Sequence, residues 1–302
     1  MFTFVVCNAS FIELITPIPK DIKYDRQKAL LGKKLFSDPI LSRDNSISCQ
    51  SCHNLSNGGS DNKQFSTGID SKVGNLNSPT VFNAIFNLSQ FWSGKAKDLK
   101  EQAHMVLFNP SEMDVNEKEL IQKLNKDPEY SAEFKIIYMD AVTLDNVIDA
   151  IVEFEKALIT PNSKFDKYLR GEMDSLNKNE KKGYELFKSY GCISCHNGVN
   201  IGGNLYQKFG VMKQYPDFTN QLGRFNATGK EEDKYHFKVP SLRNIALTAP
   251  YLHNGSVKTL KSAIEKMIIY QVGRIPNKED IQKIEAFLNT LTGDKPRILK
   301  DL

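Results

Sequence analysis

The sequence predicts a mainly α-helical protein made of two similar units, and three observations lead to that prediction. The motif C-x-x-C-H occurs twice, at residues 49–53 and 192–196. A Gly-x-x-Leu-Phe string precedes each copy, within residues 31–36 and 182–187. Apolar residues recur at helical spacing along much of the chain, whereas the alternating pattern typical of strands is scarce.

Length and composition are those of an ordinary globular protein. The chain has 302 residues, 40% of them hydrophobic and 25% charged, with a formal net charge of +4. That length fits one large domain or two of average size. The charge is mild and is not gathered in one run, so we expect no nucleic-acid partner. No apolar stretch is long enough to span a membrane.

Three helices are predicted with some precision. Apolar side chains recur at helical spacing in residues 143–159, and Thr143 is suited to be the N-cap. Two further helices are expected near the C-terminus, over residues 259–271 and 277–293. Gly293 is placed to terminate the last one.

The helices and motifs suggest two domains and a short N-terminal arm. Residues 160–172 are the expected linker between an N-terminal domain over 21–160 and a C-terminal domain over 161–302 that ends in a tail. Residues 1–20 form the arm, which could retain part of a signal peptide. Its first residues are apolar and place Cys7 in a small-x-small pattern, but they lack basic side chains.

The two C-x-x-C-H motifs are the strongest chemical signal. They consist of Cys49, Cys52 and His53 in the first unit and of Cys192, Cys195 and His196 in the second. This is the pattern by which a c-type haem is bonded to a chain, with the histidine on the iron. A disulfide framework and a zinc site are alternatives, but a chain this long needs no disulfides, and zinc requires no histidine beside each pair. We therefore expect two cytochrome c-like units with one c-type haem each and, by association, a periplasmic location.

The ligand on the other side of each iron decides its chemistry. Methionine there favours electron transfer, whereas an open position permits reaction with peroxide. For the second haem the candidate is Met267, although it could equally be a core residue, since Leu260 and Ile264 share its helix face. For the first haem, residues 54–70 contain neither histidine nor methionine.

The chain as a whole resembles the bacterial di-haem cytochrome c peroxidases, from about Leu31 to Gln271. The resemblance is carried by LGKKLFSDPILSRDNSISCQSCHNL, NSPTVFNAIFNLSQFWSG, NPSEM, the second C-x-x-C-H motif and SLRNIALTAPYLHNGSVKTL. It implies an all-α fold with a peroxidatic N-terminal haem and an electron-accepting C-terminal haem. The MauG-type enzymes, which oxidise a partner protein, share much of this pattern.

Four residues take roles from this resemblance. Met267 matches the family's methionine ligand on the second haem, and Glu112 matches its active-site carboxylate. Such a carboxylate can take a proton from one peroxide oxygen and return it to the departing one. Gln102 matches a neighbouring polar residue, and Trp92 matches one that bridges electron transfer between the haems. Without the resemblance, Glu112 would be interpreted as a surface charge and Trp92 as a core residue.

Further matches concern a metal ion and the haem propionates. The side chain of Asn77 and the backbone carbonyls of Thr248 and Pro250 correspond to a calcium site that joins the domains, and oxygen ligands suit calcium. Arg243 and His253 are expected to pair with haem propionates, the alternative being that both are ordinary surface groups.

The chain departs from the family in the loop after the first motif. Many members carry a histidine there that ligates the peroxidatic iron at rest, and an ungapped alignment places Ile69 at that position. Isoleucine cannot ligate iron, so we expect a haem that is five-coordinate or water-bound and needs no reductive activation. The rival hypothesis is a substitute ligand, His104, which with Met105 lies between Gln102 and Glu112.

The resemblance implies an enzyme that reduces hydrogen peroxide to water with electrons from a small c-type cytochrome or cupredoxin. Family members are often homodimers, so a homodimer is expected. One alternative is a MauG-like oxidase of a protein substrate, against which Met267 counts because that family has a tyrosine there. Another is a non-catalytic di-haem electron carrier, against which Glu112 counts.

Overall fold

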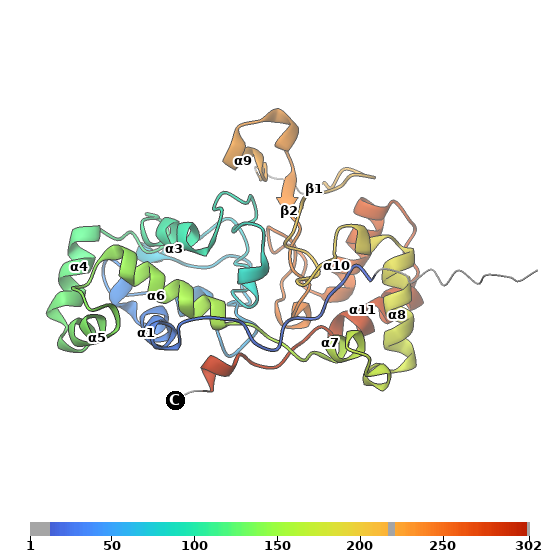
Figure 1. Cartoon of the computed structure of the whole chain (residues 1–302). Coiled ribbons are helices and arrows are strands. Elements are labelled where there is room, and N and C mark those ends of the chain that lie inside the picture. Colours follow the sequence, from blue (N-terminus) through green and yellow to red (C-terminus); the bar gives the residue numbers. More distant parts are fainter. Residues whose placement is uncertain (1–12, 217–220, 301–302) are drawn as a thin grey trace, which may run out of the picture.

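The computed structural model describes residues 13–216 and 221–300 and is mainly helical (Figure 1). The signal-peptide prediction and Cys7 fall on residues 1–12 and so lie outside the described residues. Within the described ranges, no helix combines the length and the apolar character that crossing a membrane requires. We call residues 21–160 the first half and residues 161–300 the second half.

The elements alternate with long irregular segments. The α-helices of the first half are α1 (Arg26–Ser37), α2 (Cys49–Cys52), α3 (Leu99–Leu107), α4 (Glu117–Lys126), α5 (Pro128–Tyr138) and α6 (Leu144–Ala157). Those of the second half are α7 (Lys164–Leu169), α8 (Lys178–Ser189), α9 (Phe225–Thr228), α10 (Leu260–Lys266) and α11 (Lys278–Asn289), and a π-helical turn, η8 (Met267–Val272), continues α10. The strands β1 (Tyr206–Lys208) and β2 (His236–Lys238) pair antiparallel.

Short 3-10 turns connect these elements. They are η1 (Pro39–Leu41), η2 (Ile69–Ser71), η3 (Ala84–Phe86), η4 (Met173–Ser175), η5 (Cys192–Ser194), η6 (Glu231–Asp233), η7 (Ile245–Leu247) and η9 (Arg297–Leu299). In Figure 1 the helices α1 and α3 to α6 lie on one side of the molecule, and α8, α10 and α11 lie on the other. The ribbon of β1 and β2 rises near their junction and leads to α9.

The two Gly-x-x-Leu-Phe strings lie at matching helix crossings. In α1, a Cβ on Gly32 would lie 1.9 Å from the carbonyl oxygen of Ala150 in α6. In α8, a Cβ on Gly183 would lie 1.9 Å from the carbonyl oxygen of Lys283 in α11. The repeat in the sequence is therefore a repeat in packing, because each half contains a helix pair whose close approach requires glycine.

The phenylalanine of each string packs against the histidine of the motif that follows it. The ring centroids are 6.4 Å apart in the pair Phe36 and His53. They are also 6.4 Å apart in the pair Phe187 and His196. In both halves, the helix that crosses at glycine thus also supports the cysteine motif.

Buried hydrophobic side chains form two large clusters, and the ends of the chain cross between them. The first cluster combines residues of α1 and α3 to α6 with Ile298 near the C-terminus. The second combines residues of α7, α8, α10 and α11 with Ile15 near the N-terminus. Arg243 donates to the carbonyl oxygen of Thr16 at 2.9 Å, and Lys33 donates to that of Ile298 at 3.0 Å. Each half is thus completed by a segment from the far end of the chain.

The central helix lies where the sequence predicts it, but the segment after it differs. The Thr143 hydroxyl caps α6 by accepting a hydrogen bond from the Asn146 N–H at 3.2 Å. Residues 160–172, expected as a linker, contain helix α7. This short helix begins at a reciprocal capping box between Ser163 and Asp166, which satisfies its first backbone N–H groups.

The last helix ends earlier than predicted. Helix α11 stops at Asn289 with Thr290 as its C-cap, so the prediction that Gly293 terminates it is wrong. A Cβ on Gly293 would lie 2.0 Å from the carbonyl oxygen of Thr160. Glycine is needed there for a close approach between the two segments rather than for a helix cap.

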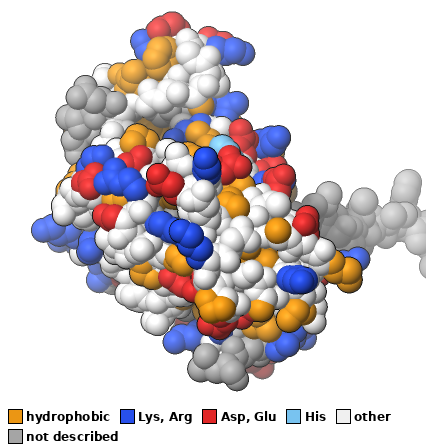
Figure 2. Space-filling view, turned by 90° about the vertical axis from the view of Figure 1, so that its left-hand side faces the viewer, with side chains coloured by type: hydrophobic (Ala, Val, Ile, Leu, Met, Phe, Trp, Pro, Cys, Tyr) orange, Lys and Arg blue, Asp and Glu red, His pale blue; other side chains and the backbone are white. Residues whose placement is uncertain are grey.

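The face around α4 and α5 carries charges of both signs. Figure 2 shows this side of the molecule, with basic and acidic side chains interspersed and apolar side chains scattered among them. One of the ion pairs, between Lys34 and Glu129, has an N–O distance of 2.6 Å. This distribution agrees with the mild net charge of +4.

Candidate functional site

The first C-x-x-C-H motif forms the short helix α2 and the residue after it. The Ser48 N–H donates to the Ser51 hydroxyl at 3.0 Å, which fixes the start of the helix. Burial lowers the pKa of His53, so its imidazole is neutral and suited to bind a metal. The four motif cysteines are not joined in disulfides. In residues 13–216 and 221–300, no group of three or more His, Cys, Asp or Glu side chains is arranged to hold a metal ion.

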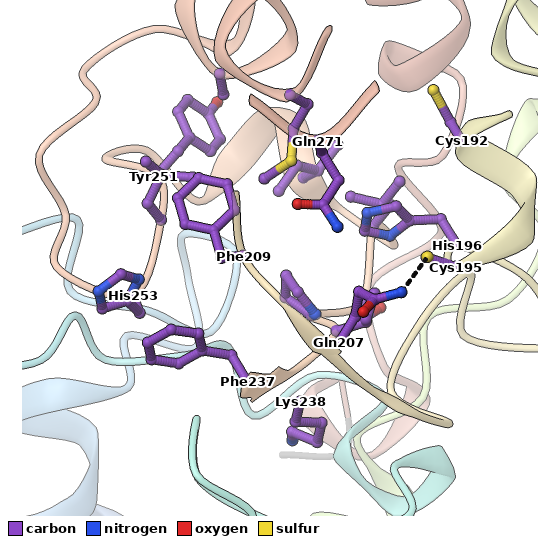
Figure 3. A pocket seen from close by; sticks show the side chains of 18 of the residues that line it. Cys192, Cys195, His196, Gln207, Phe209, Phe237, Lys238, Tyr251, His253 and Gln271 are labelled. Atoms are coloured by element: carbon purple, nitrogen blue, oxygen red, sulfur yellow. Dashed lines mark hydrogen bonds between the residues drawn. The ribbon is translucent and has the colours of Figure 1, made fainter. Parts of the chain in front are cut away.

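The second motif lines a cavity of about 370 Å³ whose walls come mainly from the second half and in part from the first; Figure 3 shows part of it. His196 Nδ1 lies 3.3 Å from the carbonyl oxygen of Ile201, a contact that leaves Nε2 as the ring nitrogen able to bind a metal. Burial lowers the pKa of His196 to about 4, so this imidazole is also neutral. Met267 lines the same cavity, as the first residue of η8.

The residues around this cavity fit a c-type haem. Its walls are largely apolar and aromatic, and include Phe209, Phe237, Tyr251, Leu260, Ile264 and Leu288. Cys192 and Cys195 are available for thioether bonds, and His196 and Met267 offer a nitrogen and a sulfur to one iron. Met267 lies in the wall of this cavity, and its ligand role stays a prediction.

The charge of Glu112 acts on the first motif. Burial raises the pKa of the Cys52 thiol, and the charge of Glu112 contributes to that increase. Burial also raises the pKa of Glu112, while the positive charge of Lys95 and a hydrogen bond from the Asn109 side chain oppose the increase. Such a carboxyl keeps its proton to a higher pH than an exposed one, which suits a group that must both take and give a proton.

The loop after the first motif is docked against the segment that carries Glu112. Ile69 is 0% exposed, and its N–H donates to the carbonyl oxygen of Glu112 at 2.9 Å. A Cβ on Gly68 would lie 2.1 Å from the carbonyl oxygen of Ser111, so glycine permits this approach. The loop therefore presents an aliphatic side chain, which offers no ligand to a metal.

A group of charged side chains, which we call the Arg43 clamp, reinforces this docking; its members are Arg43, Asp70, Lys72 and Asp114. The Arg43 guanidinium donates to Asp70 at 2.6 Å and also to Asp114. Lys72 Nζ donates to the carbonyl oxygen of Pro110 at 2.8 Å. The hydrogen bond from Arg43 lowers the pKa of Asp70. The clamp thus joins the loop to both sides of Glu112.

Gln102, His104 and Met105 lie on α3. Gln102 and Met105 are half-buried, whereas His104 is exposed and its ring packs against Phe108 with centroids 4.7 Å apart. An exposed histidine held against a neighbouring ring is poorly placed to replace the missing loop ligand. The role of Gln102 stays a prediction.

Trp92 extends from the first half into the cavity of the second. Its Nε1 donates to the carbonyl oxygen of Asn77 at 2.8 Å, and its own carbonyl oxygen accepts from the Lys238 N–H at 2.8 Å. Its ring meets that of His253 edge-on, with centroids 6.3 Å apart. It also packs against the aromatic cluster that Met267 contacts. Trp92 therefore lies at the junction of the two halves.

The three residues matched to a calcium site line the same cavity, where the halves meet. Asn77 donates its side-chain N–H to the carbonyl oxygen of Lys63 at 2.9 Å, which leaves its amide oxygen as the atom that could bind a cation. Together with the carbonyls of Thr248 and Pro250 this makes an all-oxygen donor set, of the kind calcium prefers. Calcium itself stays a prediction.

The two residues expected to pair with propionates are placed differently. Arg243 is 1% exposed, is not among the residues that line the cavity, and donates to the fully buried Asp166 at 2.8 Å. Its other nitrogens donate to the carbonyl oxygens of Val199 and Thr16. This differs from the expectation, because the charge of Arg243 is already neutralised within the protein. His253 does line the cavity, and burial lowers its pKa to about 4, so it is neutral at pH 7.

Two buried charged residues near the motifs were not expected from the sequence. Lys238 in β2 is 7% exposed and lines the cavity, and burial lowers its pKa to about 8. Glu155 in α6 is 4% exposed, and burial raises its pKa to about 8. Its charge adds to the effect of burial in raising the pKa of Cys49. In the sequence, the available sign of a buried charge was a charged residue next to an apolar one, as Lys238 is next to Phe237.

Residues 26–174 match a family model described as di-haem cytochrome c peroxidase. Over 286 residues the chain is 49% identical to the cytochrome c551 peroxidase of Nitrosomonas europaea, covering 94% of this chain and 85% of that protein. It is 46% identical to the cytochrome c peroxidase Ccp of Escherichia coli, covering 93% of this chain but only 61% of that protein.

The fold also has similar solved structures. A MauG-like protein associated with microbial copper homeostasis superposes with a TM-score of 0.81 at 26% sequence identity, covering 95% of both chains. The similarity extends over both halves, because so little of either chain is left out.

Proposed function

The chain belongs to the di-haem cytochrome c peroxidase family, and on that premise we propose that it reduces hydrogen peroxide to water with electrons from a small c-type cytochrome or cupredoxin. The observation that carries the proposal is the carboxyl of Glu112, half-buried beside the first C-x-x-C-H motif and held by a loop that brings Ile69 instead of an iron ligand. Two cytochrome c-like domains are part of the proposal, with one haem bound covalently in each.

The haem-binding residues follow from the two motifs. Cys49, Cys52 and His53 would hold the peroxidatic haem, and Cys192, Cys195, His196 and Met267 would hold the electron-accepting haem. When bound, the two haems supply the electron-transfer chemistry of the reaction. The lowered pKa values of His53 and His196 support their role as ligands, because only the neutral imidazole binds a metal.

Glu112 performs the proton transfer. Reduction of one peroxide molecule to two water molecules consumes two electrons and two protons, and one oxygen must gain a proton as the O–O bond breaks. Glu112 would take a proton from one peroxide oxygen and give it to the other, which then departs as water. The raised pKa of Glu112 supports this role, because it allows the carboxyl to carry a proton between the two atoms. Gln102 orients the peroxide.

A haem held by the first motif would be open to peroxide in the oxidised protein, so the enzyme would need no prior reduction. The side chain of Ile69 cannot ligate iron, and its backbone is bonded to Glu112. The Arg43 clamp supports this state because it fixes the loop in its docked position. His104, the rival ligand, is exposed.

The remaining parts of the proposal concern the junction of the halves and the setting of the protein. Trp92 carries electrons between the haems, and Asn77, Thr248 and Pro250 hold a calcium ion. The enzyme is a periplasmic homodimer. Lining residues from both halves in a single cavity support the first two assignments.

A steady-state assay on the fully oxidised protein, with peroxide and reduced cytochrome c, tests the proposal. We expect turnover without a lag, and we expect azide to change the electron paramagnetic resonance signal of the first haem. An N-terminal haem that is wholly low-spin and ignores azide would contradict the open site. A protein that carries both haems but oxidises a partner protein instead of cytochrome c would support the MauG-like alternative.

A further inference from the structure

Lys238 is a buried cation in the wall of the cavity, and Figure 3 shows it with other residues that line it. It is 7% exposed, and its neighbours Phe237 and Val239 are 6% and 7% exposed. Its backbone N–H is bonded to the Trp92 carbonyl at 2.8 Å, and β2 pairs with β1. The position of this lysine is therefore fixed by the backbone on which it sits.

No described carboxylate neutralises this charge. Burial is the whole cause of the lowered pKa of Lys238, and no aspartate or glutamate among residues 13–216 and 221–300 opposes it. Arg243, a similarly buried cation, shows the usual solution, because it pairs with Asp166 at 2.8 Å. Burying an unpaired charge is costly, so the cavity that Lys238 lines should contain a counter-ion when the protein is complete.

The chemistry of the cavity identifies that counter-ion. Cys192, Cys195 and His196 line it, and a haem attached there brings two propionate carboxylates. Arg243 cannot balance them, because its donors are used elsewhere. His253 can offer a hydrogen bond but not a charge at pH 7.

We propose that Lys238 binds a propionate carboxylate of the haem attached to Cys192 and Cys195, and that its positive charge favours the reduced state of that haem. The inference rests on the proposed function, since it requires a haem at the second motif. A positive charge held in a weakly polar site lowers the energy of the state that carries one more electron.

Redox titration of the holoprotein tests this inference on three variants. Lys238→Met removes the charge, and Lys238→Arg retains it. Lys230→Met is the control, because Lys230 lies on the connection between β1 and β2 but is exposed and is not among the residues that line the cavity. We expect the reduction potential of the second haem to fall in Lys238→Met, to stay close to wild type in Lys238→Arg, and to be unchanged in Lys230→Met.

Counting haems per chain with the pyridine haemochrome assay separates the possible failures. A Lys238→Met protein with two haems and a wild-type potential would overturn the inference and leave the proposed function intact. A wild-type protein without haem at the second motif would overturn the proposed function first. If Lys238→Met does not accumulate, resonance Raman spectra of wild type and Lys238→Arg test whether Lys238 contacts a propionate. The propionate-bending band should differ between them, and identical bands would count against Lys238.

Discussion

The two halves of the molecule share one packing scheme but complete it with different chemistry. Each has a helix pair that meets at a glycine, Gly32 or Gly183. Each also has an asparagine in the left-handed conformation, with φ of 62° at Asn83 and 59° at Asn244. After that asparagine, an irregular segment in each half leads into a helix, α3 or α10. The shared features hold a C-x-x-C-H motif in place and do not by themselves decide its function.

The difference lies at the end of that helix. The N-caps of α3 and α10 are Asp98 and Thr259. Met267 follows Thr259 at the same distance in the sequence as Val106 follows Asp98, so Val106 is the residue of the first half that corresponds to Met267. One half therefore has a sulfur where the other has an aliphatic side chain. The first half adds Glu112 from the segment after α3 instead. The two halves thus differ at the positions where a ligand or a carboxyl is supplied, while their packing is shared.

The largest expected effect is the loss of catalysis in Glu112→Gln, which removes the proton carrier that only the first half has. We expect kcat for peroxide to fall by at least about 100-fold. Azide binding to the oxidised protein should persist, because the open position does not depend on Glu112. Glu117→Gln, at an exposed carboxylate on α4, is the control, and activity near wild type in Glu112→Gln would remove Glu112 from the mechanism.

Met267→Val gives the second half the same aliphatic residue that the first half has at the matching position. We expect the methionine-to-iron charge-transfer band of the oxidised protein to disappear, and a second equivalent of azide to bind per chain. Optical titration with azide measures both effects. Met105→Val, at a methionine of α3, should leave the spectrum unchanged, and a band that survives Met267→Val would restore the core interpretation of Met267.

Gly32→Ala and Gly183→Ala test whether the two crossings are equivalent. Each new Cβ would lie 1.9 Å from a carbonyl oxygen, so each helix pair must separate. We expect each substitution to lower the free energy of unfolding by about 1–3 kcal/mol. Denaturant titration measures this, with Gly74→Ala as control because the nearest atom to a Cβ there is at 3.5 Å. A loss in only one of the two variants would show that the halves differ in packing as well as in chemistry.

Lys95→Met should have the smallest effect, and again only on the first half. The positive charge of Lys95 lowers the pKa of Glu112, so its removal raises that pKa further. The acid limb of the pH profile of kcat/KM for peroxide should then move to higher pH, with activity unchanged on the alkaline side. Because Lys95 is exposed, the shift should be small and should shrink in high salt. A shift to lower pH would contradict the assignment of Glu112 as the titrating group.

Local patterns could be predicted from the sequence, and long-range partners could not. Helix α6 and its cap at Thr143 depend on residues within a few positions of each other, as do the two motifs. The Gly-x-x-Leu-Phe repeat was visible, but its cause was not. The carbonyl groups that require Gly32 and Gly183 belong to helices far along the chain.

The same limit explains why the place of Arg243 differs from the expectation and why Lys238 was not expected. Arg243 and Lys238 lie close together in the sequence, and nothing local distinguishes which of them faces the cavity. Only the fold brings Asp166 to Arg243 and leaves Lys238 without a described carboxylate. Gly293 was assigned to a helix end because glycine often stands there. Its actual neighbour, Thr160, is known only once the two segments have been packed together.

The crossing of the two outer segments makes the stability of each half depend on the other. Ile298 is buried in the first cluster and Ile15 in the second, although each lies at the opposite end of the sequence from the half that it completes. Detaching either segment therefore exposes apolar surface in the distant half and removes the hydrogen bond that Lys33 or Arg243 makes to it. We expect the two halves to unfold in one cooperative transition rather than one after the other.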